Sequence, residues 1–406
     1  MTAADFEAFL DHLAATPSVE GDTYASAVRE ARDRLKLHPE LRRGSETEFV
    51  YNDPVLSRLL YGAQEAERLQ ASLLAAGEPG ENLTTSWWRW APMVCKTAFH
   101  RLTGSEEKLA SLTPSAPIKL AKQRLRLAIV GDAGFSGLAQ DAVIAMILGR
   151  HKSAPFDAVV HLGDVYRAAD ADAMKKHFLA PFSVFGFRGA RVYTLLGNHD
   201  VYLGGEAYIS ALKALDQPGR YFCMETRNWQ VACLDTTLFD TSPRRSNGGM
   251  EQTQLDWLER ILHQEKPVLL LSHHYYISAW GQSGAPLMKI LRPVFCRAGS
   301  PRAWYWGHEH LLAAYPKHPD GFSGACVGNG AFLEEAKPPY AFKGKTKRPD
   351  WYAKPEWFPK SKCACFDDKQ RYWPHGYLEV ELTPTGIEES YHLEAAPASY
   401  QRSVAI

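Results

Sequence analysis

Five short segments of this chain carry side chains that can bind metal ions. They are Gly131-Asp132-Ala133-Gly134, Gly163-Asp164-Val165-Tyr166, Gly197-Asn198-His199-Asp200, Ser272-His273-His274 and Gly307-His308-Glu309-His310. Their carboxylate, amide and imidazole groups suit manganese, iron or zinc better than calcium or magnesium, and none of them offers a thiolate. Two such cations lower the pKa of a bound water and neutralise charge on a phosphoryl group. The predicted chemistry is therefore metal-assisted hydrolysis.

An apolar run of the kind that forms buried β-strands precedes each of these segments. The runs are 125–130, 158–162, 192–196, 268–271 and 304–306, with a further run at 231–234. Helix candidates alternate with them at 140–148, 171–185 and 252–262. This alternation predicts an α/β domain whose strands are buried on both faces and whose functional groups gather beyond the carboxyl ends of the strands. The Gly or Ser at each strand end allows a tight turn and a close approach to an ion.

Each segment is a weak signal by itself, because Gly-Asp-x-Gly is also an ordinary turn. The Asn198-His199 pair after an apolar run is more specific, since packing rarely requires these two residues at a strand end. His308 and His310 are two residues apart, so on an extended segment they face the same side. The order of five such motifs, each at a strand end, makes a purely structural explanation improbable.

The ordered set GDxG, GDxx, GNHD, HH and GHxH resembles the calcineurin-like metallophosphoesterase family. Gly134 stands where most members have His, which is similar to the purple acid phosphatase branch. The resemblance covers roughly residues 124–330, about half of the chain. It implies a layered α/β/β/α sandwich that binds two divalent metal ions (manganese, iron or zinc).

The resemblance also implies a role for each matching position. Asp164 would bridge both metals, Asp132 and His310 would complete the first site, and Asn198, His273 and His308 would complete the second. His199, supported by Asp200, would donate a proton to the leaving group or steady the phosphoryl oxygens. His274 would line the substrate pocket.

The second motif departs from the purple acid phosphatase pattern. That branch has a metal-binding Tyr three residues after the Asp, where this chain has Arg167, and Tyr166 lies one residue earlier. On an extended segment a slip of one residue turns the side chain to the other face, so Tyr166 would join the first site only if a local turn allows it. Arg167 could instead bind a substrate phosphate through its guanidinium, with a surface salt bridge as the alternative.

The rest of the chain lies outside the resemblance. Residues 1–120 are predicted to form a helical N-terminal extension, with Phe6, Phe9, Leu10 and Leu13 at helical spacing and a second pattern at 56–74. The metallophosphoesterase domain would then span 121–406, including a basic, aromatic-rich loop at 335–375 and a C-terminal β-hairpin (377–382 and 387–393). The cluster Trp87-Trp88-Arg89-Trp90 is expected to pack the extension, with a membrane or partner patch as the alternative.

Composition sets few further limits. Lys+Arg and Asp+Glu are both 46, so global charge argues neither for nor against a nucleic-acid partner, and none is indicated. No run of about 18 apolar residues predicts a transmembrane segment, and the N-terminus has no secretory pattern. The seven scattered cysteines are expected to be reduced, which favours a cytoplasmic location. The N-terminal helices could bind a protein partner.

Three functions stay open at this point. The first is a phosphomonoesterase that uses a metal-bridging hydroxide, favoured by the similarity to purple acid phosphatases. The second is a phosphodiesterase acting on a nucleotide or a lipid head group. The third is a scaffold that has kept the fold and lost catalysis, against which stands the presence of all six ligands and His199.

Overall fold

The structure is a computed structural model, and its description covers most of the chain beyond residue 106. It describes residues 2–15, 23–45, 49–52, 56, 60, 107–114, 116–135, 137–166, 169–202, 204–242, 245–280, 286–332, 352–360, 372–394 and 400–406. Contacts divide the chain into two compact units. The first consists of residues 1–108 with 202–204, and the second of residues 109–201 with 205–406.

The first unit begins with two helices. Its described elements are α1 (Ala3–Ala15), α2 (Thr23–Leu37), the turn η1 (Pro39–Leu41), β1 (Arg42–Gly44) and β2 (Phe49–Tyr51). The four predicted apolar positions of α1 are all buried, which confirms its amphipathic pattern. The antiparallel pair of β1 and β2 was not predicted, because strands of three residues carry almost no periodicity. Most of the predicted helix at 56–74 and the tryptophan cluster at 87–90 lie outside the described residues.

The remaining elements begin at residue 107. They are α5 (Glu107–Ala110), β3 (Ile118–Lys119), β4 (Leu125–Val130), α6 (Leu138–Ser153), β5 (Ala158–His161), α7 (Ala171–Ala173), the π-helical segment η4 (Met174–Leu179), α8 (Ala180–Gly186), β6 (Arg191–Thr194), the turn η5 (His199–Val201), α9 (Glu206–Ala214), β7 (Phe222–Glu225), β8 (Gln230–Cys233), α10 (Gln252–Leu262), β9 (Val268–Ser272), α11 (Pro286–Ala298), β10 (Ala303–Trp306), β11 (Leu312–Tyr315), β12 (Ser323–Val327), β13 (Gly376–Thr383), β14 (Gly386–Leu393) and β15 (Tyr400–Ala405).

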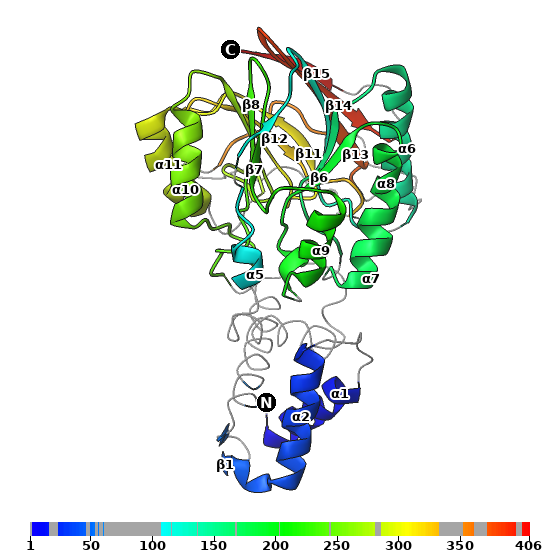
Figure 1. Cartoon of the computed structure of the whole chain (residues 1–406), viewed down its shortest axis with the longest axis vertical. Coiled ribbons are helices and arrows are strands. Elements are labelled where there is room, and N and C mark those ends of the chain that lie inside the picture. Colours follow the sequence, from blue (N-terminus) through cyan, green and yellow to red (C-terminus); the bar gives the residue numbers. More distant parts are fainter. Residues whose placement is uncertain are drawn as a thin grey trace. The chain divides into compact units, whose positions relative to one another are not determined.

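Two mixed sheets form the centre of the second unit. One has seven strands in the order β11-β12-β10-β9-β8-β7-β3, and the other has six in the order β15-β14-β13-β4-β5-β6. Helices α10 and α11 cover the outer side of the first sheet, and α6 and α8 cover the outer side of the second (Figure 1). This α/β/β/α arrangement confirms the predicted fold class.

The two sheets pack face to face through a shared apolar layer. Leu127 and Val160 of the six-stranded sheet belong to the same buried cluster as Leu269 and Tyr305 of the seven-stranded sheet. The alternate residues of these strands face the helices on the outside. Burial on both faces explains why the strands are continuous apolar runs in the sequence.

Beyond residue 121, the predicted strands, helices and C-terminal hairpin are present, with bounds that differ by one or a few residues. The predicted helix at 171–185 is continuous in space but contains the π-helical segment η4. Four strands of four to six residues were missed: β7, β11, β12 and β15. Strands this short give too little periodicity to stand out in the sequence, and their pairing partners are needed to define them.

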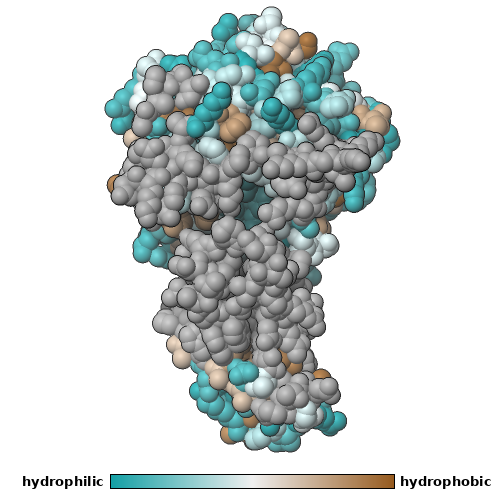
Figure 2. Space-filling view, turned by 180° about the vertical axis from the view of Figure 1, so that it is seen from behind, coloured by the Kyte–Doolittle hydropathy of each residue, from teal (hydrophilic) through white to brown (hydrophobic). Residues whose placement is uncertain are grey.

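The described surface of the second unit is mainly hydrophilic on the face seen in Figure 2, with its hydrophobic residues scattered. Within the described residues, no helix is long and apolar enough to cross a membrane. Cys223, Cys233, Cys296 and Cys326 are free, and three of them are buried.

A buried carboxylate, Glu379 on β13, connects the six-stranded sheet to α6. It is only 5% exposed and binds Arg126 of β4, both Nε and Nη2 of Arg150 (2.8 and 3.0 Å) and Nε2 of His392 (3.0 Å). Although burial by itself raises the pKa of Glu379, the hydrogen bonds from His392 and the two arginines outweigh it, and the net effect holds the pKa far below its usual range.

Replacing Glu379 by glutamine is expected to lower the free energy of unfolding at pH 7 by about 2–3 kcal/mol. This loss is smaller than that expected for a fully buried ion pair, because Arg150 is 43% exposed. The ionised form is favoured in the folded state. The stabilisation is therefore present above the unfolded pKa of about 4.3 and is lost as pH falls below it. Urea unfolding at pH 7 and pH 3 should show a difference from wild type that shrinks at the lower pH. Glu381→Gln, on the same strand but 28% exposed, is the matched control; an equal loss there would contradict the role of burial.

Candidate metal centre

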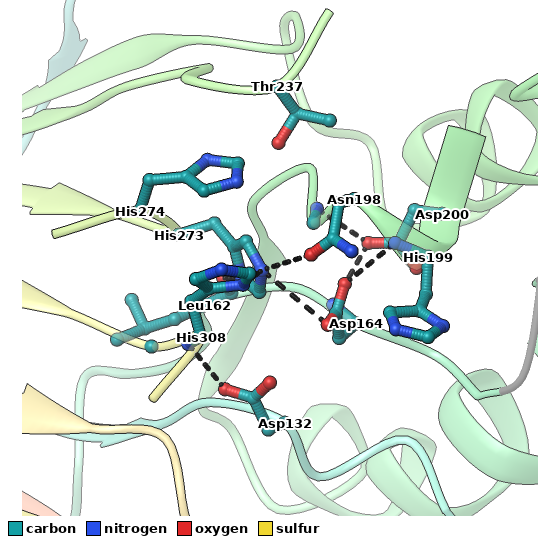
Figure 3. Close-up of polar contacts among 12 residues, drawn as sticks. Asp132, Leu162, Asp164, Asn198, His199, Asp200, Thr237, His273, His274 and His308 are labelled. Carbon is teal, nitrogen blue, oxygen red and sulfur yellow. Dashed lines mark hydrogen bonds and ion pairs between the residues drawn. The ribbon is translucent and has the colours of Figure 1, made fainter. Parts of the chain in front are cut away.

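The predicted ligands converge where the carboxyl ends of strands from the two sheets meet. Asp132, Asp164 and Asn198 follow β4, β5 and β6 of the six-stranded sheet, while His273 and His308 follow β9 and β10 of the seven-stranded sheet. Figure 3 shows these side chains directed towards a common centre. Residues that are up to 176 positions apart are thus neighbours, since the backbone N–H of His308 donates to Asp132 Oδ2 (2.8 Å).

Two glycines make this close approach possible. A Cβ on Gly197 would fall on the carboxylate of Asp164, and Gly163 has a φ of +103° with its backbone against Gly197. The positive φ of Gly163 agrees with the tight turn predicted at these strand ends, and Gly197 in addition leaves room for the carboxylate of Asp164.

Backbone strain is concentrated at the same place. The non-glycine residues with positive φ in the described chain number seven, and four of them lie in the motifs: Asp132 (55°), Asp164 (72°), His308 (66°) and His310 (20°). Such conformations are uncommon outside glycine and gather at functional sites, where the surrounding fold has to enforce them. The fold therefore maintains this geometry at an energetic cost.

One half of the centre surrounds His273. Its Nε2 lies 3.0 Å from Asn198 Oδ1, 3.1 Å from His308 Nδ1 and 3.5 Å from Asp164 Oδ2. Its Nδ1 lies 3.0 Å from the carbonyl of Leu162, to which it can donate a hydrogen bond. That bond selects the tautomer in which the Nε2 lone pair faces the cluster, as a metal-binding imidazole requires.

The other half surrounds Tyr166. Its hydroxyl lies 2.7 Å from Asp132 Oδ1, 3.1 Å from Asp164 Oδ2 and 2.8 Å from His310 Nε2. Asp132 and His310 are themselves 3.4 Å apart at Oδ1 and Nε2. Asp164 takes part in both halves, and the six predicted ligands are all within this one cluster.

The sequence left the position of Tyr166 open, to be decided by the local turn. The φ of +72° at Asp164 turns the chain and removes the two-residue alternation of a strand, so the hydroxyl of Tyr166 lies in the cluster. The turn is held by the pairing of Gly134 with Val165. Only the backbone conformation, which the residue types do not reveal, could have placed this hydroxyl.

Within the part of the chain that the structure describes, no Arg or Lys balances the charge of the cluster. Asp132 and Asp164 are 0% and 1% exposed, and among the described residues neither has an Arg or Lys partner. Burial raises the pKa of Asp132. It also lowers the pKa of His273 and His308 well below the usual value, so these imidazoles are neutral. Buried carboxylates beside neutral imidazoles match the donor set of transition-metal cations, so these residues fit a metal pair.

His199 lies across the centre from the other histidines. Its backbone N–H donates to Asp164 Oδ1 (2.9 Å), and its ring is 4.6 Å from the ring of Tyr166. Figure 3 shows the imidazole beside Asp164, on the side opposite His274 and His308. This side chain is partly exposed, so it can meet a substrate that enters the centre.

Asp200 is buried beneath the second and third motifs. Its carboxylate accepts hydrogen bonds from the backbone N–H groups of Gly197 (2.7 Å), Asp164 (3.0 Å) and Val165 (2.8 Å). Burial, together with the charge of Asp164, raises its pKa. Asp200 therefore ties the two strand-end loops together, and its predicted support of His199 stays a prediction.

His274 is buried next to His308, with 4.7 Å between the ring centroids. Its two nitrogens lie 3.0 Å from Thr236 Oγ1 and 2.7 Å from the carbonyl of Arg245. With both nitrogens occupied, His274 has no lone pair for a metal, so its predicted pocket-lining role remains open. Arg167, the other predicted substrate-binding residue, lies outside the described residues.

Two histidines outside the motifs, His151 and His161, have structural positions. His161 is buried between Phe178 and Phe182, and burial lowers its pKa to about 3. His151 lies within hydrogen-bonding distance of the backbone at Phe156 and Arg188. Neither reaches the metal cluster through these contacts.

Sequence reasoning missed one aromatic side chain at the centre. Phe332 stacks on His310 with 4.1 Å between ring centroids. It lies two residues beyond Gly330, and a single phenylalanine in the sequence gives no signal that separates it from a core residue.

Comparisons with known proteins agree with this geometry. Residues 125–312 match the family model of the calcineurin-like phosphoesterases. No curated protein sequence matches the chain. Similar solved structures include GAP50, the anchor in the inner membrane complex of Plasmodium (14% identity, TM-score 0.51, covering 70% of this chain and 90% of that chain), and a dimetal phosphatase from Danio rerio (13% identity, TM-score 0.46, covering 69% and 98%). At these identities the structural similarity concerns the fold alone. Over residues 125–312, somewhat less than half of its length, the chain is therefore similar to the calcineurin-like phosphoesterase family.

Proposed function

We propose that this protein is a metal-dependent hydrolase of phosphate esters. The observation that carries the proposal is the buried cluster of two carboxylates, three motif histidines and Asn198, in which no described Arg or Lys offsets the negative charge. A cluster of this composition is costly to bury unless cations neutralise it. The family match of residues 125–312 supports a phosphate ester as the substrate.

The two halves of the cluster suggest two metal positions. Asp132, His310 and the hydroxyl of Tyr166 would hold the first ion, and Asn198, His273 and His308 would hold the second. Asp164 would bridge them, because its carboxylate contacts both halves. Manganese, iron and zinc suit these oxygen and imidazole ligands.

When bound, two such cations supply an ionised water and neutralise charge on the phosphoryl group. The chain's own residues would complete the reaction. His199, partly exposed beside Asp164, is positioned to give a proton to the departing oxygen. Asp200 would keep the Asp164 and Asn198 loops in register through its three backbone hydrogen bonds.

A phosphomonoesterase of the purple acid phosphatase type is the form we favour. It is supported by Gly134 in the first motif and by the hydroxyl of Tyr166, which shares hydrogen bonds with Asp132 and His310. A phosphodiesterase acting on a nucleotide or a lipid head group is the alternative. We further propose a cytoplasmic location, supported by the free thiols of the described cysteines.

Metal removal and restoration test this proposal. Elemental analysis of the purified protein is expected to find about two metal ions per chain. Dialysis against a chelator should abolish hydrolysis of p-nitrophenyl phosphate, and adding manganese, zinc or iron should restore it. Parallel assays with bis-p-nitrophenyl phosphate rank the monoester against the diester.

The proposal would be contradicted if the protein held no bound metal and hydrolysed neither ester after all three metals were supplied. The non-catalytic scaffold would then be the remaining function. Activity that survives complete metal removal would also contradict the proposal. Faster hydrolysis of the diester than of the monoester would agree with metal-dependent hydrolysis but would contradict the proposed phosphomonoesterase activity.

A further inference from the structure

The metal cluster is partly exposed at His310. The side chains of Asp132, Asp164 and His273 are at most 1% exposed, whereas that of His310 is 21% exposed. Tyr166 covers this side from within, as its hydroxyl is 2.8 Å from His310 Nε2. A substrate that reaches the cluster past His310 meets the residues that border this histidine.

Two phenylalanines border it. Phe332 stacks on the His310 ring at 4.1 Å and lies 4.8 Å from the ring of Tyr166. Phe135 lies 6.2 Å from both Phe332 and Tyr166, in edge-to-face orientation. The rings of His310, Phe332, Tyr166 and Phe135 form a continuous aromatic cluster beside a candidate metal ligand, and Tyr166 is its buried member.

The backbone holds both phenylalanines firmly. The N–H groups of Gly330 and Ala331 donate to the carbonyls of Gly131 (2.9 Å) and Asp132 (3.1 Å), which aligns the chain before Phe332 with the first motif. Phe135 directly follows Gly134, which is paired with Val165 of the second motif. Both phenylalanines are therefore attached to the same loops that carry the ligands.

Burial distinguishes these rings from core phenylalanines. Phe178 and Phe182 are 0% and 1% exposed, as expected for packing residues. Phe135 and Phe332 are only partly buried, although they lie beside a polar cluster. Partly exposed aromatic rings at the mouth of a site are suited to stack on a flat ligand.

We propose that Phe332 and Phe135 form an aromatic shelf that binds a planar ring in the leaving group of the phosphate ester, and that the substrate class is nucleotide-like. The proposal rests on the proposed function, because it assigns the substrate of that same site. A nucleobase fits the shelf, since every base has a flat face that stacks on an aromatic side chain whatever its sequence identity.

Adenosine 5′-monophosphate and ribose 5-phosphate test the shelf, because they share a phosphate and a ribose and differ in the base. In metal-loaded wild-type protein, kcat/KM should favour the nucleotide by about 5- to 100-fold, the range that stacking of one base provides. Phe332→Leu keeps an apolar side chain without a flat face, and it should bring this ratio close to one. Phe332→Tyr should retain the ratio, and Phe187→Leu, at an 88% exposed phenylalanine, is the matched control.

The outcomes separate the two proposals. The shelf would be overturned if wild type hydrolysed both esters with a kcat/KM ratio near one. It would also be overturned if neither Phe332→Leu nor Phe135→Leu changed that ratio. In both cases the proposed phosphoesterase activity would stand. If neither ester is hydrolysed, calorimetric binding of the same two compounds to wild type and Phe332→Leu decides the shelf alone. Tighter binding of the nucleotide that Phe332→Leu abolishes would support the shelf, and equal binding of both compounds would overturn it.

Discussion

Asp164→Asn is expected to lower kcat/KM for p-nitrophenyl phosphate by about 10³-fold, because the residue contacts both halves of the proposed metal centre. Asparagine keeps an oxygen that can accept the N–H of His199, now 2.9 Å away, so the loop should retain its shape. What is lost is the charge that would bridge two cations.

The same substitution should separate metal binding from folding. Without metal the variant should be as stable as wild type, since it no longer buries an uncompensated carboxylate. Added manganese or zinc should raise the melting temperature of wild type and leave that of the variant nearly unchanged, because a ligand stabilises only the folded state that binds it.

Asp216→Asn is the matched control for this experiment. Asp216 also has a positive φ (52°), but its side chain is 91% exposed and pairs with Arg191. Activity and metal response should both stay at wild-type levels there. If Asp164→Asn still bound two ions and hydrolysed the ester normally, the bridging role would be wrong.

His199→Ala is expected to reduce hydrolysis according to the leaving group. Proton donation by a general acid contributes about 10²–10⁴-fold. The loss should approach this range for glycerol 3-phosphate, whose alkoxide needs a proton, and should be much smaller for p-nitrophenyl phosphate, whose phenolate leaves without one. The metal content should not change, since His199 is not among the seven proposed ligands.

Kinetics on the two esters therefore reveal the role of His199. His263→Ala, at a histidine that is 58% exposed on the surface, controls for removal of an imidazole. An equal loss for both leaving groups would exclude proton donation and would favour the other predicted role, in which His199 steadies the phosphoryl oxygens.

Much of the architecture was accessible before the structure. The strands around 125–130, 158–162 and 268–271 are buried on both faces, and so they appear as unbroken apolar runs. The metal-competent residue types follow them directly in the sequence. Fold class and the identity of the candidate ligands were therefore predictable from local features alone.

Other features depend on contacts between distant segments. Tyr166 reaches the centre because Asp164 adopts a φ of +72°, and no residue type specifies that conformation. His274 is occupied at both nitrogens only because Thr236 and Arg245 come from a loop far away in the chain. The role of Phe332 depends on the pairing of Gly330 with Gly131, some 200 residues earlier.

Chemical identity and spatial arrangement thus have different origins in this protein. The sequence by itself determined which side chains stand at the strand ends and which metals suit them, because ligand chemistry belongs to each residue. Only the tertiary structure decided that two sheets place these ends together, that Tyr166 turns inward and that aromatic rings border His310. The physical reason is that these arrangements follow from long-range strand pairing and from strained backbone angles that the packed fold enforces.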